Sequence, residues 1–495
     1  FDDEGVPGQK TYMVEDGVLT SYLHDRISAS YYGVAPTGNG RRESFRYMPI
    51  PRMRATYMDS GKAKAEDIIP ADYIKSEGRI DYGSVVWWKM PVLRKCADYF
   101  ASSATEEDKA LYESFCKKEK SWLNNFASYM SIKEFYDKKA QEEKVEGSAS
   151  VWNKYWPKDL AACKKTAVTK WNKEHEQNVE QYKIIQFFFA VQWSELKTYA
   201  NENGIKIIGD IPIYVSLDSA DTWANQSLFQ MNEKTLEQKV CAGVPPDYFC
   251  ATGQLWGNPL YDWKAMKEDG YAWWVERIKH MLSLVDIVRI DHFRGFESYW
   301  AVPYGAENAI GGKWCKGPGK ELFNVIKEKL GELPIIAEDL GIITEKVTEL
   351  RKKCGFPGMK ILQFAFDSRE ESDYIPYRYV PNSIVYTGTH DNDTILGWCE
   401  TAAAKDVENA REYLRATDNR SLVKEMMIAG MSSVSNTCIL TAQDLFCLGK
   451  EARMNIPSTV GNNWKWRASK SMFTDEANEF LEHFTYIYGR ASKVN

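Results

Sequence analysis

The stretch VDIVRIDHF, residues 285–293, decides the fold class of this chain. Its run of β-branched apolar residues is typical of a short strand that is buried on both faces, as in a parallel sheet. Charged residues follow directly where the apolar run stops. Five other runs share this character: IKIIGDIPIYV (205–215), LPIIAEDLG (333–341), KILQFAFD (360–367), NSIVYTGTHDND (382–393) and TCILTAQDLF (437–446). Six such runs predict six buried parallel strands.

Helical patterns separate these strands, for example ITEKVTELRKKCG and DNRSLVKEMMIAGMSS. Alternating strands and helices predict a parallel sheet with right-handed crossovers, and therefore a fold of the α/β class. Such a sheet is either doubly wound or closed as a barrel, and the pattern alone favours neither. No glycine-rich phosphate-binding motif follows any of the strands, which argues against nucleotide binding.

The composition is that of a globular protein of 495 residues, with 44% hydrophobic and 27% charged residues. No apolar run is long enough to span a membrane, and a net charge of -6 without a basic stripe argues against a nucleic-acid partner. The chain is rich in aromatic residues, with 17 Trp and 28 Tyr. Aromatic planes stack on sugar rings but also fill protein cores, so this excess is compatible with both uses.

The ten cysteines are scattered and form no C-x-x-C pair, so we expect no disulfide framework. The first residues, FDDEGVPGQK, do not have the pattern of a secretory signal peptide. We therefore expect a cytoplasmic protein. The six histidines include no H-E-x-x-H motif, which argues against a zinc site, and no cofactor is expected. The oligomeric state has no signature in the sequence.

Three of the predicted strands end in acidic residues. Asp291 lies two residues after Arg289, Glu338 ends the run IIAE, and Asp391 follows His390. In α/β barrels the catalytic groups lie at the carboxyl ends of the strands. Carboxyl groups there suit glycoside chemistry, in which one carboxylate attacks the anomeric carbon and a second carboxylic acid protonates the leaving oxygen. Acids at strand ends also cap the following helices, and this explanation stays open for each acid taken alone.

Seven stretches between residues 71 and 490 resemble the amylomaltases, the 4-α-glucanotransferases of glycoside hydrolase family 77 in the α-amylase clan. These stretches are GRIDYGSVVWWKMPVLRK, IGDIPIYVSLDSADTWAN, AGVPPDYFCATGQLWGNPLYDW, VRIDHFRGFESYWAVP, IIAEDLG, YTGTHDNDTILGW and NNWKWR. The resemblance implies a (β/α)8 TIM-type barrel with helical insertions. It also implies that Asp291 is the nucleophile, Glu338 the acid/base and Asp391 the transition-state stabiliser. Arg289 and His390 would line the sugar subsite beside the cleaved bond.

The same resemblance indicates further substrate-binding positions. Residues 243–259 resemble the family's active-site lid, in which aromatic rings stack on the glucan and polar side chains contact its hydroxyl groups. The candidates are Tyr248, Phe249, Trp256, Asp247 and Asn258, with Phe364 in LQFAF and Asn455 in ARMNIPS as weaker ones. Trp256 on its own is equally compatible with core packing, but the glycines of GQLWGNP favour a loop and hence a ligand contact.

Residues 1–68 have a different character. TYMVEDGVLTSYLHD predicts a hairpin with its turn at Asp16-Gly17. The stretches DDEGVPGQKTYMVEDGVLTSYLHDRISAS, GVAPTGNGRRES and MPIPRMRATYM resemble the C-terminal domain of TldD/PmbA metallopeptidases, whose zinc motif has no counterpart here. We therefore expect a small β-rich segment over 1–68 and a catalytic barrel over 71–495. Within the barrel we expect a helical insertion at about 83–200 and an active-site loop insertion at 216–284, and no counterpart of barrel strands 1 and 2.

Three hypotheses for the function follow. The first is a 4-α-glucanotransferase that moves α-1,4-glucan segments between maltodextrins by a retaining double displacement, with maltodextrin as its partner and no cofactor. The second is a catalytically impaired, glucan-binding or misjoined protein of the same family, because two barrel strands have no counterpart in the sequence. The third is a peptidase-related protein that takes its properties from residues 1–68, and without a zinc motif we do not expect this activity.

Overall fold

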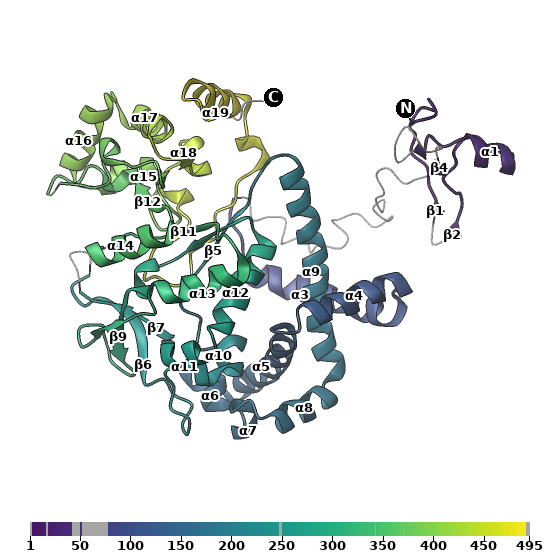
Figure 1. Cartoon of the computed structure of the whole chain (residues 1–495), viewed down its shortest axis with the longest axis horizontal. Coiled ribbons are helices and arrows are strands. Elements are labelled where there is room, and N and C mark those ends of the chain that lie inside the picture. The colour runs from purple at the N-terminus through teal and green to yellow at the C-terminus, as the bar shows by residue number, and fades with distance from the viewer. Residues whose placement is uncertain are drawn as a thin grey trace. The chain divides into compact units, whose positions relative to one another are not determined.

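In the computed structural model, the described residues are 2–15, 18–41, 50–51, 78–246, 250–341, 343–369 and 371–491. The chain divides into two compact units, residues 1–75 and 76–495. Figure 1 colours the chain from its N-terminal unit in purple to its C-terminus in yellow. Across the described residues, no helix is both long enough and apolar enough to cross a membrane.

The described residues of the first unit form two short antiparallel strand pairs and one helix. Strand β1 (Val14–Glu15) pairs with β2 (Val18–Leu19), which confirms the hairpin, although its turn residues Asp16 and Gly17 lie outside the described part of the chain. Strand β3 (Gly40–Arg41) pairs with β4 (Ile50–Pro51). Between the two pairs lies α1 (Arg26–Tyr32), whose first turn is capped by the Asp25 carboxylate.

The second unit contains the six predicted parallel strands. They are β5 (Ile208–Ile211), β8 (Ile287–Ile290), β11 (Ile335–Ala337), β12 (Gly358–Ile361), β13 (Ser383–Tyr386) and β14 (Thr437–Ile439). They form two three-stranded parallel sheets, in the orders β11-β8-β5 and β12-β13-β14. The helices between consecutive strands are those of a repeated βα unit, so the expected α/β class is confirmed.

The two parallel sheets meet where β11 lies beside β12. The Ala337 N–H donates to the Pro357 carbonyl at 3.0 Å, and the Met359 N–H donates to the Asp339 carboxylate at 2.7 Å. The outer strands of this six-stranded series are then β5 and β14. Ile208 on β5 is 38% exposed, which is unusual for a barrel strand that has neighbours on both sides. Among residues 78–491 the parallel strands thus form an incomplete barrel, since a closed one needs eight.

Helices make up the insertion expected at about 83–200. They are α3 (Tyr82–Ser103), α4 (Glu106–Lys118), α5 (Leu123–Glu143), η2 (Gly147–Ala149), α6 (Trp152–Tyr155), α7 (Lys158–Ala161), α8 (Lys165–Glu174) and α9 (Glu176–Glu202). The long helix α9 packs against α3 and α5, as Figure 1 shows. Gly204 adopts a positive φ of 75° just beyond α9, the conformation in which a glycine commonly ends a helix.

The segment 216–284 is mostly regular structure. It contains α10 (Ala220–Ala224), η3 (Gln226–Leu228), β6 (Val240–Val244), β7 (Gln254–Pro259), α11 (Trp263–Glu268) and α12 (Ala272–Leu284). Strands β9 (Ser298–Pro303) and β10 (Lys313–Lys316) join β6 and β7 in an antiparallel sheet of order β10-β9-β6-β7. The expectation that GQLWGNP is a loop is wrong, because its residues 254–259 form β7. Gly257, at a φ of 78°, bends this strand without ending it.

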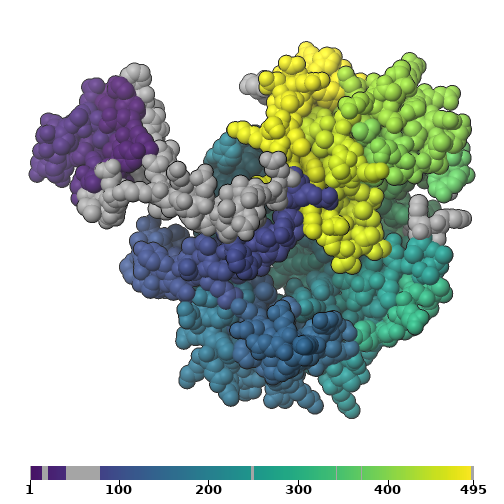
Figure 2. All heavy atoms as spheres, turned by 180° about the vertical axis from the view of Figure 1, so that it is seen from behind, coloured from purple at the N-terminus to yellow at the C-terminus, as the bar shows by residue number. Residues whose placement is uncertain are grey.

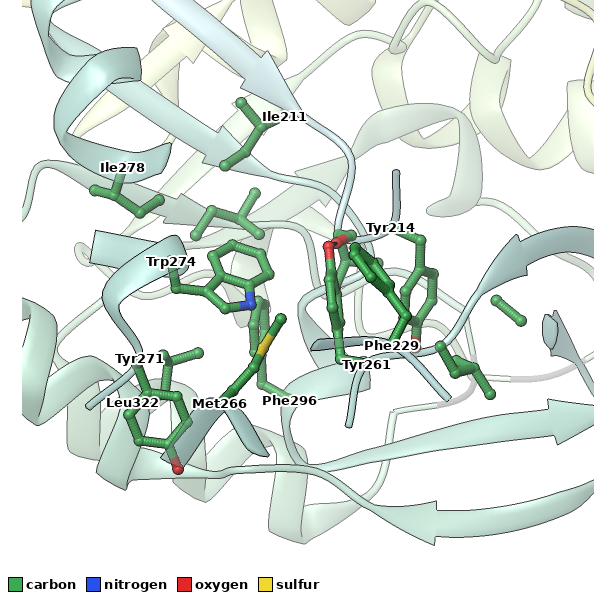
Figure 3. Packing of buried hydrophobic residues seen from close by; sticks show 14 of the residues in the cluster. Ile211, Tyr214, Phe229, Tyr261, Met266, Tyr271, Trp274, Ile278, Phe296 and Leu322 are labelled. Carbon is green, nitrogen blue, oxygen red and sulfur yellow. Dashed lines mark hydrogen bonds between the residues drawn. The ribbon is translucent and has the colours of Figure 1, made fainter. Parts of the chain in front are cut away.

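The main core lies between the helical insertion, the first parallel sheet and α12. Figure 3 shows aromatic rings meeting there, with Tyr214, Phe229 and Tyr261 side by side and Trp274 beside Phe296. Of the tryptophans in the helical insertion, Trp152, Trp156 and Trp171 are buried in this cluster. Much of the aromatic excess is therefore used for packing.

The remaining elements cover the carboxyl half of the unit. They are η4 (Phe293–Phe296), α13 (Lys320–Leu330), α14 (Glu345–Cys354), η5 (Leu362–Phe364), η6 (Pro376–Arg378), α15 (Ile395–Thr401), α16 (Ala404–Leu414), α17 (Asn419–Ser432), α18 (Ala442–Leu445), η7 (Lys450–Ala452), η8 (Lys470–Met472) and α19 (Asp475–Ile487). In Figure 2 the yellow C-terminal segment lies against the dark blue start of α3. The Ile80 N–H donates to the Lys465 carbonyl at 2.7 Å there, and the Tyr82 hydroxyl to the Trp464 carbonyl, also at 2.7 Å.

Candidate active site

Asp291 and Glu338 lie at the carboxyl ends of two neighbouring parallel strands. The register pairs Ala337 of β11 with Ile290 of β8, so the next residue along each strand reaches the same edge of the sheet. The Glu338 N–H donates to the Ile290 carbonyl at 3.0 Å, and the Asp291 N–H donates to the Ile211 carbonyl at 2.9 Å. The backbone ladder therefore extends one residue past each strand and brings the two acids together. Their position is the one in which α/β barrels carry catalytic groups.

The guanidinium of Arg289 joins two aspartates at this edge. It donates to Asp210 at 2.6 Å and to Asp291 at 3.1 Å, and its own side chain is 9% exposed. Its Nε also points at the sulfur of Met359, at 3.4 Å. Burial alone would lower the pKa of Arg289, but the charges of Asp210 and Asp291 raise it overall. Arg289 therefore stays charged and provides the positive charge beside Asp291.

Two opposing effects act on Asp291. Burial in the cleft raises the pKa of this carboxyl, and the charges of Asp210 and Asp391 act in the same direction. The charge and hydrogen bond of Arg289 lower it. The net direction is upward, because desolvation disfavours the charged form more than one shared guanidinium favours it. The Arg289 contact thus offsets part of the rise and favours the ionised form of Asp291.

Glu338 is the buried acid of the site. Its two carboxyl oxygens accept backbone N–H groups, Oε2 from His292 at 2.7 Å and Oε1 from Leu340 at 2.9 Å. Burial and the charge of Asp291 raise the pKa of Glu338 to about 8, against the lowering effect of Arg289 and of these two N–H groups. At neutral pH this carboxyl therefore holds a proton. A neutral carboxylic acid beside a carboxylate paired with arginine is the combination that lets two acids take different roles.

Asp391 lies in the loop that follows β13 of the second parallel sheet, where an amide and a guanidinium hold it. The Asn455 amide donates to its carboxylate at 2.6 Å, and the Arg453 guanidinium donates to its backbone carbonyl at 2.7 Å. The His390 ring lies against Trp464, with the ring centroids 5.0 Å apart, and its Nε2 is 3.6 Å from the Asp391 carboxylate. The Asp391 side chain is 45% exposed. It therefore presents an open carboxylate to the cleft.

The other predicted binding residues have mixed surroundings. Trp256 is 37% exposed, and its ring meets that of His292 edge to face at 4.8 Å. The Asn258 amide donates to the Val215 carbonyl at 3.1 Å, a contact inside the fold. The 39% exposed ring of Phe364 packs on Tyr374. The predicted residues Asp247, Tyr248 and Phe249 lie outside the described part of the chain.

Sequence reasoning missed four residues that contact the acids or their neighbours. They are Asp210, His292, Arg453 and Trp464. Asp210 carried a readable signal, because the run IKIIGDIPIYV also contains an acid near its strand end. Arg453 and Trp464 lie in the stretches ARMNIPS and NNWKWR, which the family resemblance had indicated, but the spacing of the sequence alone does not place them beside Asp391. Among the described residues, no cluster of three or more His, Cys, Asp or Glu is arranged to hold a metal ion.

Comparison with known families gives two matches. A family model described as 4-alpha-glucanotransferase, glycoside hydrolase family 77, matches residues 41–472. A second model, the PmbA/TldA metallopeptidase C-terminal domain, matches residues 1–74. The two resemblances stated from the sequence are thereby confirmed.

Individual relatives agree with the first match. The 4-alpha-glucanotransferase of Clostridium butyricum is 46% identical over 412 residues, which are 83% of this chain and 81% of that protein. That of Streptococcus pneumoniae (strain R6) is 44% identical over 441 residues, 88% and 84% of the two chains. The solved amylomaltase from Streptococcus agalactiae in complex with acarbose superposes with a TM-score of 0.79 at 38% identity, over 85% of this chain and 82% of that one. The site geometry, the family match and these relatives agree, and the chain belongs to the 4-alpha-glucanotransferase family, glycoside hydrolase family 77.

Proposed function

We propose that this chain is a disproportionating 4-alpha-glucanotransferase that moves α-1,4-glucan segments between maltodextrins. One observation carries the proposal: a buried, proton-holding Glu338 lies beside Asp291, which is paired with Arg289, at the ends of two adjacent strands. The relatives are named for this transfer, and the S. agalactiae structure holds acarbose. An α-1,4-glucan is therefore the substrate class that we assign.

In the proposed reaction the two acids divide the work of a retaining double displacement. A carboxylate oxygen of Asp291 attacks the anomeric carbon while the proton of Glu338 passes to the leaving oxygen. The bond between this carbon and Asp291 then holds the glycosyl group. Glu338, now ionised, takes the proton of an incoming sugar hydroxyl, which attacks the same carbon and releases Asp291. Asp391 faces the positive charge that develops on the sugar ring.

The substrate contacts follow from the same arrangement. We assign Arg289 to hold Asp291 ionised, and His390 and Asn455 to the sugar subsite that Asp391 lines. Trp256 offers a half-exposed ring for stacking, and Phe364 offers a second exposed ring at the end of β12. Asp247, Tyr248, Phe249 and Asn258 remain candidates from the sequence. None of these steps uses a metal ion or a cofactor.

The proposed functional boundaries place the chemistry in residues 71–495. Each described site residue belongs to the unit 76–495, and we assign no group of the reaction to the described part of residues 1–68. We also assign the protein to the cytoplasm, since the ten cysteines form no disulfide, as expected in a reducing compartment.

The second candidate function is a catalytically impaired, glucan-binding or misjoined member of the same family. The exposed strand β5 favours it, because Asp210 lies on this strand and pairs with Arg289, so disorder at the open edge would reach Asp291. An open strand edge also invites pairing with another chain.

Incubation with maltotriose separates the two candidates. The transferase converts maltotriose to longer maltodextrins and glucose, and the Asp291→Asn variant forms neither. Glucose and maltose without longer products would indicate a hydrolase. Maltotriose that stays unchanged at high enzyme concentration, while acarbose still quenches tryptophan fluorescence, would reject the transferase and support the glucan-binding protein. Azocasein cleavage that a chelator blocks would instead revive the peptidase hypothesis.

A further inference from the structure

His292 lies in a turn that contacts both the side chain and the backbone of Glu338. It follows Asp291 at the end of β8 and adopts a left-handed backbone conformation, with φ 50° and ψ 48°. Its N–H donates to the Glu338 carboxylate at 2.7 Å, and the next N–H, that of Phe293, donates to the Glu338 carbonyl at 3.1 Å. A non-glycine residue in this region is uncommon and strained, which points to a specific role.

The His292 ring is fixed between two neighbours. On one side it meets the ring of Trp256 edge to face at 4.8 Å. On the other side lies Gly295, where an added methyl group would come within 3.3 Å of His292 Cδ2 and 2.7 Å of the Ile213 side chain. The ring therefore lies in a space with no room for a side chain at position 295, beside the turn whose N–H contacts Glu338.

The charge of His292 does not explain its place in the site. Burial and the nearby charge of Arg294 lower the pKa of His292 to about 3, so the ring is neutral at any pH at which the enzyme works. What the residue contributes is its backbone N–H and the shape of its ring. A backbone N–H that points at a carboxylate stabilises the ionised form of the carboxyl.

We propose that His292 is a positioning residue for Glu338, and that Trp256 acts on Glu338 through the His292 ring. Trp256 lies on β7 with 37% of its surface exposed, so a sugar that stacks on it also presses on the ring that sets the turn. Occupancy of the cleft at Trp256 is thereby linked to the orientation and the ionisation of the acid. This inference rests on the proposed function, because it assigns to Glu338 the role of acid/base.

A pair of variants at residue 292 tests the proposal. His292→Asn keeps a residue that tolerates the left-handed region, whereas the β-branched His292→Val does not. With maltotriose as substrate we expect kcat of His292→Val to fall about 10- to 100-fold with little change in KM, since one hydrogen bond to a charged group is lost. We expect the basic limb of its pH–rate profile to move up by about one pH unit, because the lost N–H had favoured ionised Glu338. His292→Asn should restore both.

Trp256→Leu is the second arm, because it leaves the turn residue in place and does not depend on the folding of a strained variant. It should raise KM and also move the basic limb in the same direction as His292→Val. Trp87→Leu, which removes a 73% exposed tryptophan from α3, is the matched control and should change neither. A basic limb that stays at the wild-type pH in both His292→Val and Trp256→Leu would overturn the proposal.

Thermal unfolding between pH 5 and 9 gives a readout that does not need turnover. Tm is measured against pH for the wild type, His292→Val and His292→Asn, each with and without Glu338→Gln. The difference between the two curves of each pair is the part of the pH dependence that is due to Glu338. If maltotriose is not converted but this difference moves in His292→Val and not in His292→Asn, the positioning role stands and the transferase falls. If maltotriose is converted and this difference is the same in the wild type, His292→Val and His292→Asn, the positioning role of His292 is rejected while the transferase function stands.

Discussion

The two parallel sheets of the barrel unit hold their acids by different means. In the sheet β11-β8-β5, buried Arg289 joins Asp210 to Asp291, and Glu338 lies under the surface with a raised pKa. In the sheet β12-β13-β14, Asp391 is open to the cleft and is oriented by the amide of Asn455. The first sheet controls where a proton lies, and the second controls only where a carboxylate points.

This difference follows from the burial of Arg289 and Glu338, because the side chains of Asp291 and Asp391 are almost equally exposed, at 44% and 45%. Charges in a desolvated place interact strongly and shift each other's pKa, whereas an open carboxylate is screened by water and needs geometry alone. A retaining glycosyl transfer requires both, namely two acids with separate protonation states and a third that faces the developing charge. Variants in the first sheet should therefore change rates, stability and pH dependence together, and variants in the second sheet should change rates alone.

The largest expected effect is on Glu338. Glu338→Gln removes the transferable proton and should lower kcat for maltotriose by roughly 10²–10⁴-fold, the usual contribution of general acid–base catalysis. The neighbouring Asp339→Asn is the matched control, since Asp339 pairs with Arg351 and not with the reacting groups. We expect the Asp339→Asn control to be less stable than the wild type, with a kcat that falls less than tenfold. Turnover of Glu338→Gln near the wild-type value would show that another group is the acid.

The second effect is the pH dependence of stability. The folded-state pKa of Glu338, about 8, lies above its ordinary value of 4.5. Protonated Glu338 therefore stabilises the folded state fully below pH 4.5, and this contribution is lost as the pH rises to about 8. We expect a loss on the order of 3–5 kcal/mol across that window, measured as the difference between wild type and Glu338→Gln in thermal unfolding. Parallel Tm curves for the two proteins from pH 5 to 9 would contradict the assignment.

The third effect concerns Arg289. Removing one partner of a buried ion pair costs 3–5 kcal/mol in typical cases, but Asp210 and Asp291 are 41% and 44% exposed, so we expect about 2 kcal/mol for Arg289→Met. The pKa of Asp291 should rise further without the guanidinium, which moves the acid limb of the pH–rate profile to higher pH.

Arg351→Met is the control for this variant, because it breaks another pair with a buried arginine, in which the partner Asp339 is itself buried and lies outside the reacting groups. It should destabilise the fold and leave the acid limb in place. An Arg289→Met profile with an unmoved acid limb would mean that Arg289 is a structural residue only.

The smallest effect belongs to the second sheet. Asn455→Ala removes one hydrogen bond to a charged group, worth about 1.5–3 kcal/mol, and should lower kcat/KM about 10- to 100-fold. The shape of the pH–rate profile should not change, because no proton is transferred there. Asn463→Ala is the control in the same segment, since Asn463 contacts Ile456 and Thr459 and not Asp391. A shifted pH profile in Asn455→Ala would remove the distinction between the two sheets.

Local patterns were sufficient for much of the fold. The six apolar runs became the six parallel strands, because an apolar run of this length has few alternatives to a buried strand. The acids that follow β8, β11 and β13 could be predicted for the same reason, since the end of an apolar run marks the end of its strand. The interpretation of GQLWGNP as a loop failed because the strand pairing of β6 and β7 overrides the local preference of two glycines.

Contacts over long distances in the chain could not be predicted. Asn455 lies 64 residues from Asp391, and Asp210 lies 79 residues from Arg289. The turn at His292 could not be predicted either, because histidine tolerates the left-handed region better than most residues but does not require it, and its contacts with Trp256 and near Gly295 exist only in the folded chain.

The sequence by itself determined the α/β class, the order of the six strands and the identity of the acids, because each of these is a property of a short segment. Only the tertiary structure decided the protonation tendency of those acids. Burial of Glu338 raises its pKa, and the Arg289 pair offsets part of the same effect on Asp291. The open edge at β5 was likewise decided in three dimensions, since a strand is exposed or covered only by what packs beside it. Solvation and charge are properties of surroundings, and distant parts of the chain supply those surroundings.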